Sequence, residues 1–365
     1  MQSFLLIFMQ IIDRYIFVKF ISSFFYAITL LMAIIVVFDF SENVSRFIDY
    51  KISWTDVIVK YYINFIPYFF NLFIPLFAFM STIWFTSKLS SNNEIVAILS
   101  GGMNFYRMLV PYIVGSVCIA SIAIFMSNVV VPRTQYNFQT FQNQSMTRWA
   151  KTTSNFHVRN SLNSYIYIDH WNIKEKRGYR FCYDELGEFF VNFRLTAREF
   201  TYDDSLKVWR LYNYSKRITS QTGEKLYSGD VMDTVFNISL LDLSQDEKAC
   251  QEMTFGAILK YIREDKEKGG GMAKYYIIEA HKRIANSLGT IIMTLLGLSV
   301  ATRKTRRGVG VHLFIGIALG FTFIFLQQVS TVFSIYGGFS PALGTWMPNI
   351  IYVFICFFMI RTCQK

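Results

Sequence analysis

The sequence predicts an α-helical integral membrane protein with six transmembrane helices, arranged three and three around an inserted all-β, jelly-roll-like extracytoplasmic domain. Hydrophobic residues make up 53% of the 365-residue chain and charged residues only 17%, against about 25% in soluble domains. The apolar residues gather in uncharged runs long enough to cross a bilayer. One central polar stretch instead carries short runs of aromatic and β-branched residues, a pattern typical of strands.

Three uncharged runs precede the polar stretch: Phe20–Phe38, Tyr61–Ser87 and Met108–Pro132. Pro67 and Pro75 in the second run favour a kink. Met1–Ile12 is apolar but lacks the positive start and the small-residue cleavage site of a signal peptide. We therefore expect an interfacial lead-in there, with Met9 as an alternative start. Residues 1–132 are assigned to transmembrane helices 1–3.

Residues 133–254 are predicted to form the β domain. The runs that favour strands are Ser164–Asp169, Glu188–Phe200, Lys207–Tyr214 and Val235–Leu241. Turn signals separate them, such as Asp203-Asp204 and Thr222-Gly223, and this spacing is typical of a sandwich or a jelly-roll-like sheet. An amphipathic helix is expected next, at Phe255–Lys268, and Gly269–Gly271 ends it.

Residues 255–365 hold this helix and the last three spans. Ile284–Thr302 is uncharged, and residues 308–360 contain no Asp, Glu, Lys or Arg. Because Gly337-Gly338 and Pro341 mark a turn, the second of these stretches is predicted to cross the membrane twice.

The distribution of Lys and Arg predicts the orientation. The basic residues expected in short loops on one side are Arg14, Lys88, Arg107, Arg303, Lys304, Arg306, Arg307, Arg361 and Lys365. The short loops of the other side hold Arg46 and Lys51, and acidic residues outnumber them. Since basic loops stay inside, both termini are expected in the cytoplasm and the β domain outside.

A short polar stretch, Ser87–Gly102, interrupts two spans on the expected cytoplasmic side. Ser91 and Glu94 have the spacing of a capping box, which predicts that a helix starts at Ser91. An apolar stripe would follow at Ile95, Ile98 and Leu99, and Gly101-Gly102 would end the helix. A helix this short is marginal by itself, so its apolar face is expected to be buried by a partner.

Three stretches carry a resemblance to the LptF/LptG family, the permease subunits of the lipopolysaccharide-export ABC transporter. They are FTSKLSSNNEIVAILSGGMNFYRMLVPY, EAHKRIANSLGTIIMTLLGLSVATRKTRRGVGV and GGFSPALGTWMPN. The likeness extends in order over nearly the whole chain, and it is most specific in the membrane segments.

The resemblance implies that residues 88–102 form the helix that couples the permease to a cytosolic ABC ATPase homodimer. The candidate coupling residues are Ser91, Glu94, Ile95, Ile98, Leu99 and Gly101. It also implies a second LptF/LptG-like permease subunit and a β domain that starts a periplasmic bridge toward the outer membrane. The chain would then be a multi-pass protein of the bacterial inner membrane that extracts lipopolysaccharide.

Four basic residues near the outer ends of two spans are candidates for the phosphates of the substrate: Arg46, Lys51, Lys282 and Arg283. A guanidinium fork suits phosphate geometry. Snorkelling at a membrane interface explains the same residues without any substrate. Gly316-x-x-x-Gly320 permits close helix packing, either within the chain or against a second permease.

We expect no enzyme activity, cofactor or metal, because the sequence contains neither a P-loop nor a catalytic constellation. The five cysteines lack metal-site spacing, and a Cys182–Cys250 disulfide stays open. Two alternatives remain: a permease for another lipid or lipoprotein, and a non-transporting scaffold whose β domain recruits partners. A scaffold would not need the cytoplasmic helix. The sequence does not distinguish an LptF-like from an LptG-like subunit.

Overall fold

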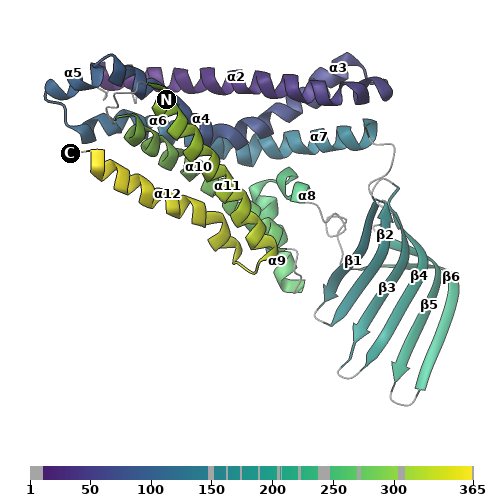
Figure 1. The fold of residues 1–365 in the computed structure, drawn as a ribbon. Helices are drawn as coiled ribbons and strands as arrows, with labels where there is room; N and C mark the ends of the chain where they lie inside the picture. Colours follow the sequence, from purple (N-terminus) through teal and green to yellow (C-terminus); the bar gives the residue numbers. More distant parts are fainter. Residues whose placement is uncertain are drawn as a thin grey trace. The chain divides into compact units, whose positions relative to one another are not determined.

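The computed structural model describes residues 11–146, 152–161, 163–172, 175–187, 190–203, 206, 208–220, 223–236, 247–268, 273–302 and 309–363. The chain divides into two compact units. One unit, residues 1–138 and 277–365, is helical, and the other, residues 139–276, contains the sheet (Figure 1). The predicted lead-in before Ile11, the glycines 269–271 and the basic residues 303–307 lie outside the described residues.

Six described helical stretches are long and apolar enough to cross a membrane, as predicted, with three before the sheet and three after it. The first three are α2 (Ile11–Asp49), the run of α3 (Trp54–Asp56), η1 (Val57–Tyr62) and α4 (Ile63–Ser91), and the run of α6 (Phe105–Phe125), η2 (Met126–Val130) and α7 (Val131–Ser145). The last three are α10 (Ala273–Ala301), α11 (Val309–Tyr336) and α12 (Pro341–Cys363). The first three stretches extend beyond the uncharged runs, because polar residues continue the helices past the hydrocarbon.

Helix α4 belongs to both apolar cores of the helical unit. Ile74, Ala78 and Phe85 pack with the buried stripe of α2, which includes Phe20 and Phe24. The other core contains two further α4 side chains together with residues of α10, α11 and α12: Phe79, Ile83, Met293, Leu296, Val300, Phe323, Tyr352 and Cys356. Figure 1 shows α4 between α2, drawn above it, and the last three helices, drawn below it.

Hydrogen bonds across helices complement this packing. Asn349 of α12 donates to the carbonyl oxygen of Ala285 in α10 at 2.9 Å, and the Tyr352 hydroxyl donates to the carbonyl oxygen of Leu319 at 2.7 Å. Such bonds matter because apolar side chains gain little by leaving lipid for a protein interior, so close packing and polar contacts hold membrane helices together.

Gly316 and Gly320 pack within the chain, which resolves the alternative that the sequence left open. A Cβ atom built on Gly316 would lie 2.5 Å from Ile83 Cδ1, and one on Gly320 would lie 2.5 Å from Leu76 Cδ1. Both glycines therefore bring α11 against α4 of the same chain. Their backbones are not a free face for a second permease.

The inserted domain contains one six-stranded antiparallel sheet in which each strand pairs with its sequence neighbours. The strands are β1 (Thr152–Ser161), β2 (Ser164–Asn172), β3 (Arg177–Leu186), β4 (Val191–Asp203), β5 (Val208–Ser220) and β6 (Gly223–Thr234). This confirms an inserted β domain, and its described strands follow the order of a meander. The strand predicted at Val235–Leu241 was wrong for Val235 and Phe236, because β6 ends at Thr234. Residues 237–241 lie outside the described residues.

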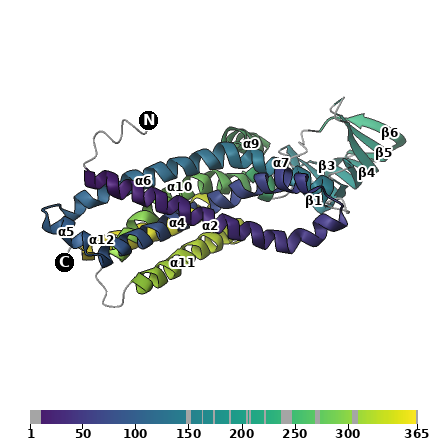
Figure 2. The same ribbon diagram turned by 90° about the horizontal axis from the view of Figure 1, so that it is seen from above.

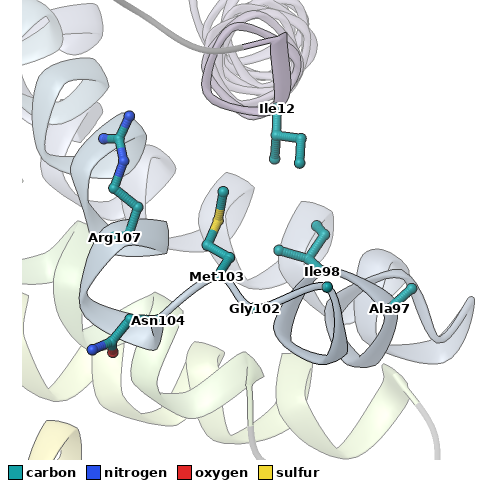
Figure 3. A pocket seen from close by; sticks show the side chains of 8 residues that line it. Ile12, Ala97, Ile98, Gly102, Met103, Asn104 and Arg107 are labelled. Atoms are coloured by element: carbon teal, nitrogen blue, oxygen red, sulfur yellow. The ribbon is translucent and has the colours of Figure 1, made fainter.

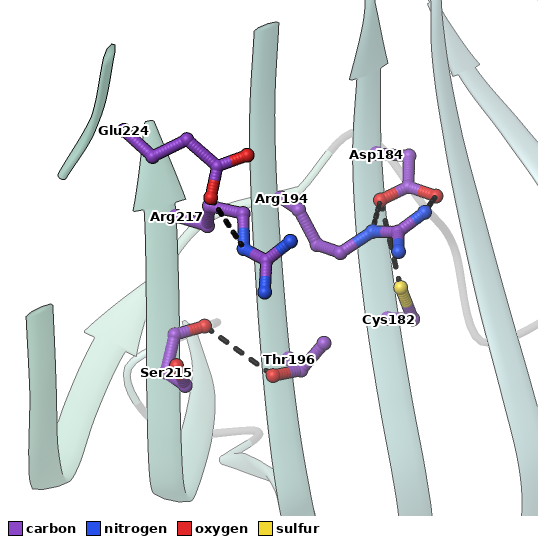
Figure 4. A network of polar contacts seen from close by, with 7 residues as sticks. All are labelled: Cys182, Asp184, Arg194, Thr196, Ser215, Arg217 and Glu224. Carbon is purple, nitrogen blue, oxygen red and sulfur yellow. Dashed lines mark hydrogen bonds and ion pairs between the residues drawn. The ribbon is translucent and has the colours of Figure 1, made fainter. Parts of the chain in front are cut away.

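One face of the sheet is apolar and the other is charged. The apolar core includes Ile166, Ile168, Phe181, Leu195 and Leu211. The opposite face carries cross-strand ion pairs, among them Arg194, whose guanidinium makes two bonds of 2.6 and 2.8 Å to Asp184 (Figure 4). Alternating side chains produce this division because successive residues of a strand point to opposite faces.

Cys182 and Cys250 are free thiols, so no disulfide joins them. Cys182 lies half-buried beside Asp184, and its Sγ is 3.6 Å from Asp184 Oδ1. Burial, and then the neighbouring carboxylate, raise the pKa of Cys182 to about 11. Two helices follow the sheet, α8 (Glu247–Glu252) and α9 (Phe255–Lys268), and the second has the predicted bounds.

The glycine contacts predict the effect of enlarging α11. Gly316→Leu should lower the stability of the monomer by about 1–3 kcal/mol, the usual cost of overpacking, because its side chain meets Ile83. Thermal unfolding of the purified chain in detergent measures this. Gly310→Leu is the matched control, since a Cβ there meets nothing within 4 Å. Equal melting temperatures for the two variants would contradict the assigned contact.

Candidate functional site

The predicted cytoplasmic helix is present but starts later than predicted. Helix α4 continues to Ser91, a turn follows, and α5 covers Glu94–Ser100. The capping box was therefore wrong: the Ser91 hydroxyl donates to the Lys88 carbonyl oxygen at 3.0 Å, inside the last turn of α4. Asn93 precedes α5 in a left-handed conformation, φ 61°, and its side chain makes no cap hydrogen bond.

The end of α5 agrees with the sequence. Gly101 follows the helix, and Gly102 has φ +88°, a conformation that glycine adopts without strain. Helix α6 begins shortly afterwards, at Phe105. Asn104 Oδ1 accepts a hydrogen bond from the Tyr106 backbone N–H at 3.2 Å and so caps α6. α5 is thus a single short element suspended between two long helices, and it lies at the same end of the helical unit as the start of α2 (Figures 1 and 2).

Glu94 is held by two neutral donors. Its Oε1 accepts from Asn92 Nδ2 at 3.0 Å, and its Oε2 accepts from the Tyr15 hydroxyl of α2 at 3.4 Å. Within the described part of the chain, no Lys or Arg forms an ion pair with this carboxylate. Glu94 is half-buried. The two hydrogen bonds within the chain fix its position, and the exposed part of the side chain remains accessible to a cation from another protein.

The apolar stripe of α5 is divided between the chain's own core and its surface. Ile95 is buried in the core that α2 and α4 form, whereas Ile98 is half-buried. Leu99 is 38% exposed, and Val96, which the sequence analysis missed, is 48% exposed. The free apolar surface is therefore Val96 and Leu99, one turn apart. The signal for Val96 was its position three residues before Leu99.

A cavity of about 610 Å³ separates α5 from the start of α2 (Figure 3). Ile12 stands on one side of it, and Ile98, Gly102 and Met103 stand on the other. Arg107 reaches into the same region from the first turn of α6. The loop after α5 therefore has open space beside it.

An ion pair between a buried carboxylate and a partly exposed guanidinium lies beside this cavity. Asp13 of α2 is 1% exposed, and its Oδ2 lies 2.5 Å from Arg107 Nη2. Sequence analysis used Arg107 only for orientation and did not single out Asp13. The available signal for Asp13 was its place beside an apolar run, because a charged residue that is buried there needs a partner of opposite charge. The pair connects the beginning of the first span directly to the segment that follows α5.

The candidate substrate residues do not form one cluster among the described side chains. Arg46 and Lys51 are exposed, at the end of α2 farthest from α5, and Arg46 Nη1 donates to Asn43 Oδ1 at 3.2 Å. The acidic neighbour Asp39 accepts from the hydroxyls of Tyr61 and Tyr62, each at 3.2 Å, so tyrosines rather than these cations engage it.

The other two candidates lie on α10. Arg283 is 4% exposed, and its Nε donates to Glu279 Oε1 at 3.0 Å, while Lys282 is half-buried. Arg283 thus has a carboxylate partner within its own helix. The described residues contain no group of three His, Cys, Asp or Glu side chains that could hold a metal ion.

Residues 14–362 match the sequence model of a family described as lipopolysaccharide export system permease LptF/LptG. Similar curated proteins are the lipopolysaccharide export system permease proteins LptG of Escherichia coli strain K12 and of Escherichia coli O6:H1 strain CFT073. Each is 22% identical over 311 residues, covering 80% of this chain and 81% of the relative.

The Asp13–Arg107 pair predicts non-additive substitutions. Arg107→Gln should cost about 1–3 kcal/mol of stability, because it removes the guanidinium that bonds to the buried Asp13 carboxylate. Asp13→Asn/Arg107→Gln should recover part of this loss, since two neutral amides can hydrogen-bond. Thermal unfolding of the two single variants and the double variant measures the coupling. Arg14→Gln, at an exposed neighbour, is the control, and strictly additive losses would contradict the pair.

Proposed function

The chain belongs to the LptF/LptG family of lipopolysaccharide export permeases, and on that premise we propose how it takes part in export. It acts as a multi-pass permease subunit of the inner membrane, driven by ATP hydrolysis in a separate cytosolic ABC ATPase homodimer. A second LptF/LptG-like permease completes the pathway. The observation that carries this proposal is α5, a short helix with an accessible carboxylate and two exposed apolar side chains at one end of a six-helix unit.

Helix α5 is proposed to dock on the ATPase. Val96 and Leu99 supply the apolar contact, and Glu94 supplies a negative charge that a Lys or Arg of the ATPase can pair with. Ile95 instead anchors α5 to its own bundle, so the helix moves with α2 and α4. A scaffold without transport would need no such element, and the family membership does not favour that alternative.

The substrate contacts are proposed for Arg46 and Lys51 first. Both side chains are exposed, and their charges are available to phosphates of lipopolysaccharide. Arg283 is proposed to orient Glu279 rather than to meet the substrate directly, because its guanidinium is buried against Glu279.

The β domain is proposed to lie in the periplasm and to begin the bridge toward the outer membrane. We keep residues 133–254 as the proposed limits of this extracytoplasmic part, with both termini and α5 on the cytoplasmic side. The two edges of the described sheet are β1 and β6, and a bridge protein can extend the sheet by adding a strand there. The exposed side chains of β6 include Leu226, Tyr227 and Val231.

The role of Glu94 is tested by Glu94→Gln. The variant keeps an oxygen to accept from Asn92 but removes the charge, and loss of one partner of a desolvated pair costs about 2–5 kcal/mol in comparable interfaces. Co-purification with the ATPase and export in cells lacking the native copy should therefore both fall strongly. Ser91→Ala is the control, because Ser91 bonds only inside α4 among the described contacts. Wild-type export by Glu94→Gln would defeat the coupling role.

Strand addition is tested by photocrosslinking from the sheet edge. Probes at Tyr227 and Val231 of β6 should capture a periplasmic protein, which also tests the orientation. A probe at Tyr165 is the control, since this side chain is exposed but β2 is an interior strand. Capture as strong from Tyr165 as from β6, or no capture from β6, would count against pairing at this edge.

A further inference from the structure

A second cavity opens beside α5, between the neighbouring ends of α2 and α4, and its volume is about 390 Å³. One face of each helix forms its walls. Tyr15, Lys19 and Tyr26 recur along α2 at spacings of four and seven residues, and Trp84 and Lys88 are four residues apart on α4. These spacings put each set on one side of its helix, so the cavity is a continuous surface of aromatic and basic side chains.

The cavity has an excess of positive charge. Lys19 and Lys88 are both exposed, and neither forms an ion pair within the described ranges. The lining also includes the carboxylate of Glu94, but its two oxygens accept from Asn92 and Tyr15. Two ammonium groups facing one such carboxylate leave a net charge that suits an anion such as a phosphate.

The position of the two lysines indicates a membrane-embedded ligand. Lys19 directly precedes the uncharged run Phe20–Phe38, and Lys88 directly follows Tyr61–Ser87. Both ammonium groups therefore lie where the helices pass from hydrocarbon to headgroups. Trp84 is 55% exposed and lies four residues before Lys88, near the interface that such side chains favour. Tyr26 is 73% exposed and lies seven residues after Lys19, inside the uncharged run.

The exposed surface of α2 continues from the cavity into the apolar run. Leu30 and Ile34 follow Tyr26 at intervals of four residues and are 50% and 52% exposed. A ligand with a phosphate and a long apolar chain matches this sequence of surfaces. Free phosphate or a nucleotide would use only the lysines.

We propose that this cavity binds an anionic phospholipid, with its phosphate between Lys19 and Lys88 and an acyl chain along Leu30 and Ile34. Assigning the lipid to the cytoplasmic leaflet rests on the proposed function, whereas the binding itself rests on the charge and depth of the cavity. A lipid in this place lies against the Tyr15–Glu94 contact and so helps to hold α5 in position.

Native mass spectrometry of the full-length chain, purified in detergent and titrated with phosphatidylglycerol or phosphatidylcholine, tests the proposal. Phosphatidylglycerol should bind preferentially. A lysine near an anionic lipid surface contributes about fivefold in affinity, so Lys19→Gln/Lys88→Gln should weaken this binding about 25-fold. Arg14→Gln is the matched control: it removes a charge from the same end of α2, at an exposed residue outside the cavity lining.

A second readout locates the lipid. Phosphatidylglycerol with brominated acyl chains should quench tryptophan fluorescence in the wild type, and Trp84→Phe should remove that part of the quenching. Unchanged phosphatidylglycerol affinity in the double variant would overturn the proposal, as would equal binding of both lipids. So would equal weakening by Arg14→Gln, or displacement of the lipid by equimolar glycerol phosphate.

These measurements need no ATPase, so their failure is separable from that of the proposed function. Lipid binding with no docking of α5 would count against the coupling role alone. Docking and export with no preference for the anionic lipid would count against the lipid site alone. Melting temperatures of all variants identify any substitution that unfolds the chain.

Discussion

The helical unit depends on close packing around α4. One side of this helix meets α2 through Ala78 and Phe85, and another side meets the last three helices through Phe79 and Ile83. Small residues permit the approach: Gly297 of α10 and Gly316 of α11 both face α4. Since lipid tails solvate apolar side chains as well as a protein interior does, this fit, rather than hydrophobic burial, holds the two halves together.

The same helix ends at the candidate coupling element. α4 finishes at Ser91, and α5 follows after a two-residue turn, so any displacement of α5 acts on the end of the central helix. The Asp13–Arg107 pair adds a second connection, from the first span to the residue segment after α5. A charge pair at this place is costly to break because Asp13 is buried, and it therefore keeps α2, α5 and α6 together.

In the β domain, alternating side chains divide between the two faces of the sheet. One face gathers aromatic and aliphatic residues, and Trp171 stacks on Phe200 there with ring centroids 5.3 Å apart. The other face pairs charges across neighbouring strands, as Arg210 does with Asp233, and this guanidinium lowers the pKa of the Asp233 carboxyl. The sheet thus buries its apolar side, and several charges of its other side pair across neighbouring strands.

The sequence by itself determined the number of spans, the β insertion and the end of α5. Uncharged runs must be helical in lipid because every backbone polar group needs a partner within the segment, and Gly102 supplies the positive φ that ends the short helix. These are local properties, readable from composition and spacing. The strands β1 and β6 were missed because their polar sequences show little of the alternation that marks a half-buried strand, whereas β3 does alternate, through Tyr179, Phe181 and Tyr183.

Only the tertiary structure decided what each candidate side chain touches. The S-x-x-E spacing predicted a helix start at Ser91, but α4 continues through that residue and Glu94 bonds to Tyr15, far away in the sequence. Spacing likewise allowed Gly316 to pack either against another subunit or within its own chain, and the structure places it against Ile83 of α4. The reason is physical: capping competes with continuation of a packed helix, and burial, pairing and cavities depend on residues that meet only when distant helices pack.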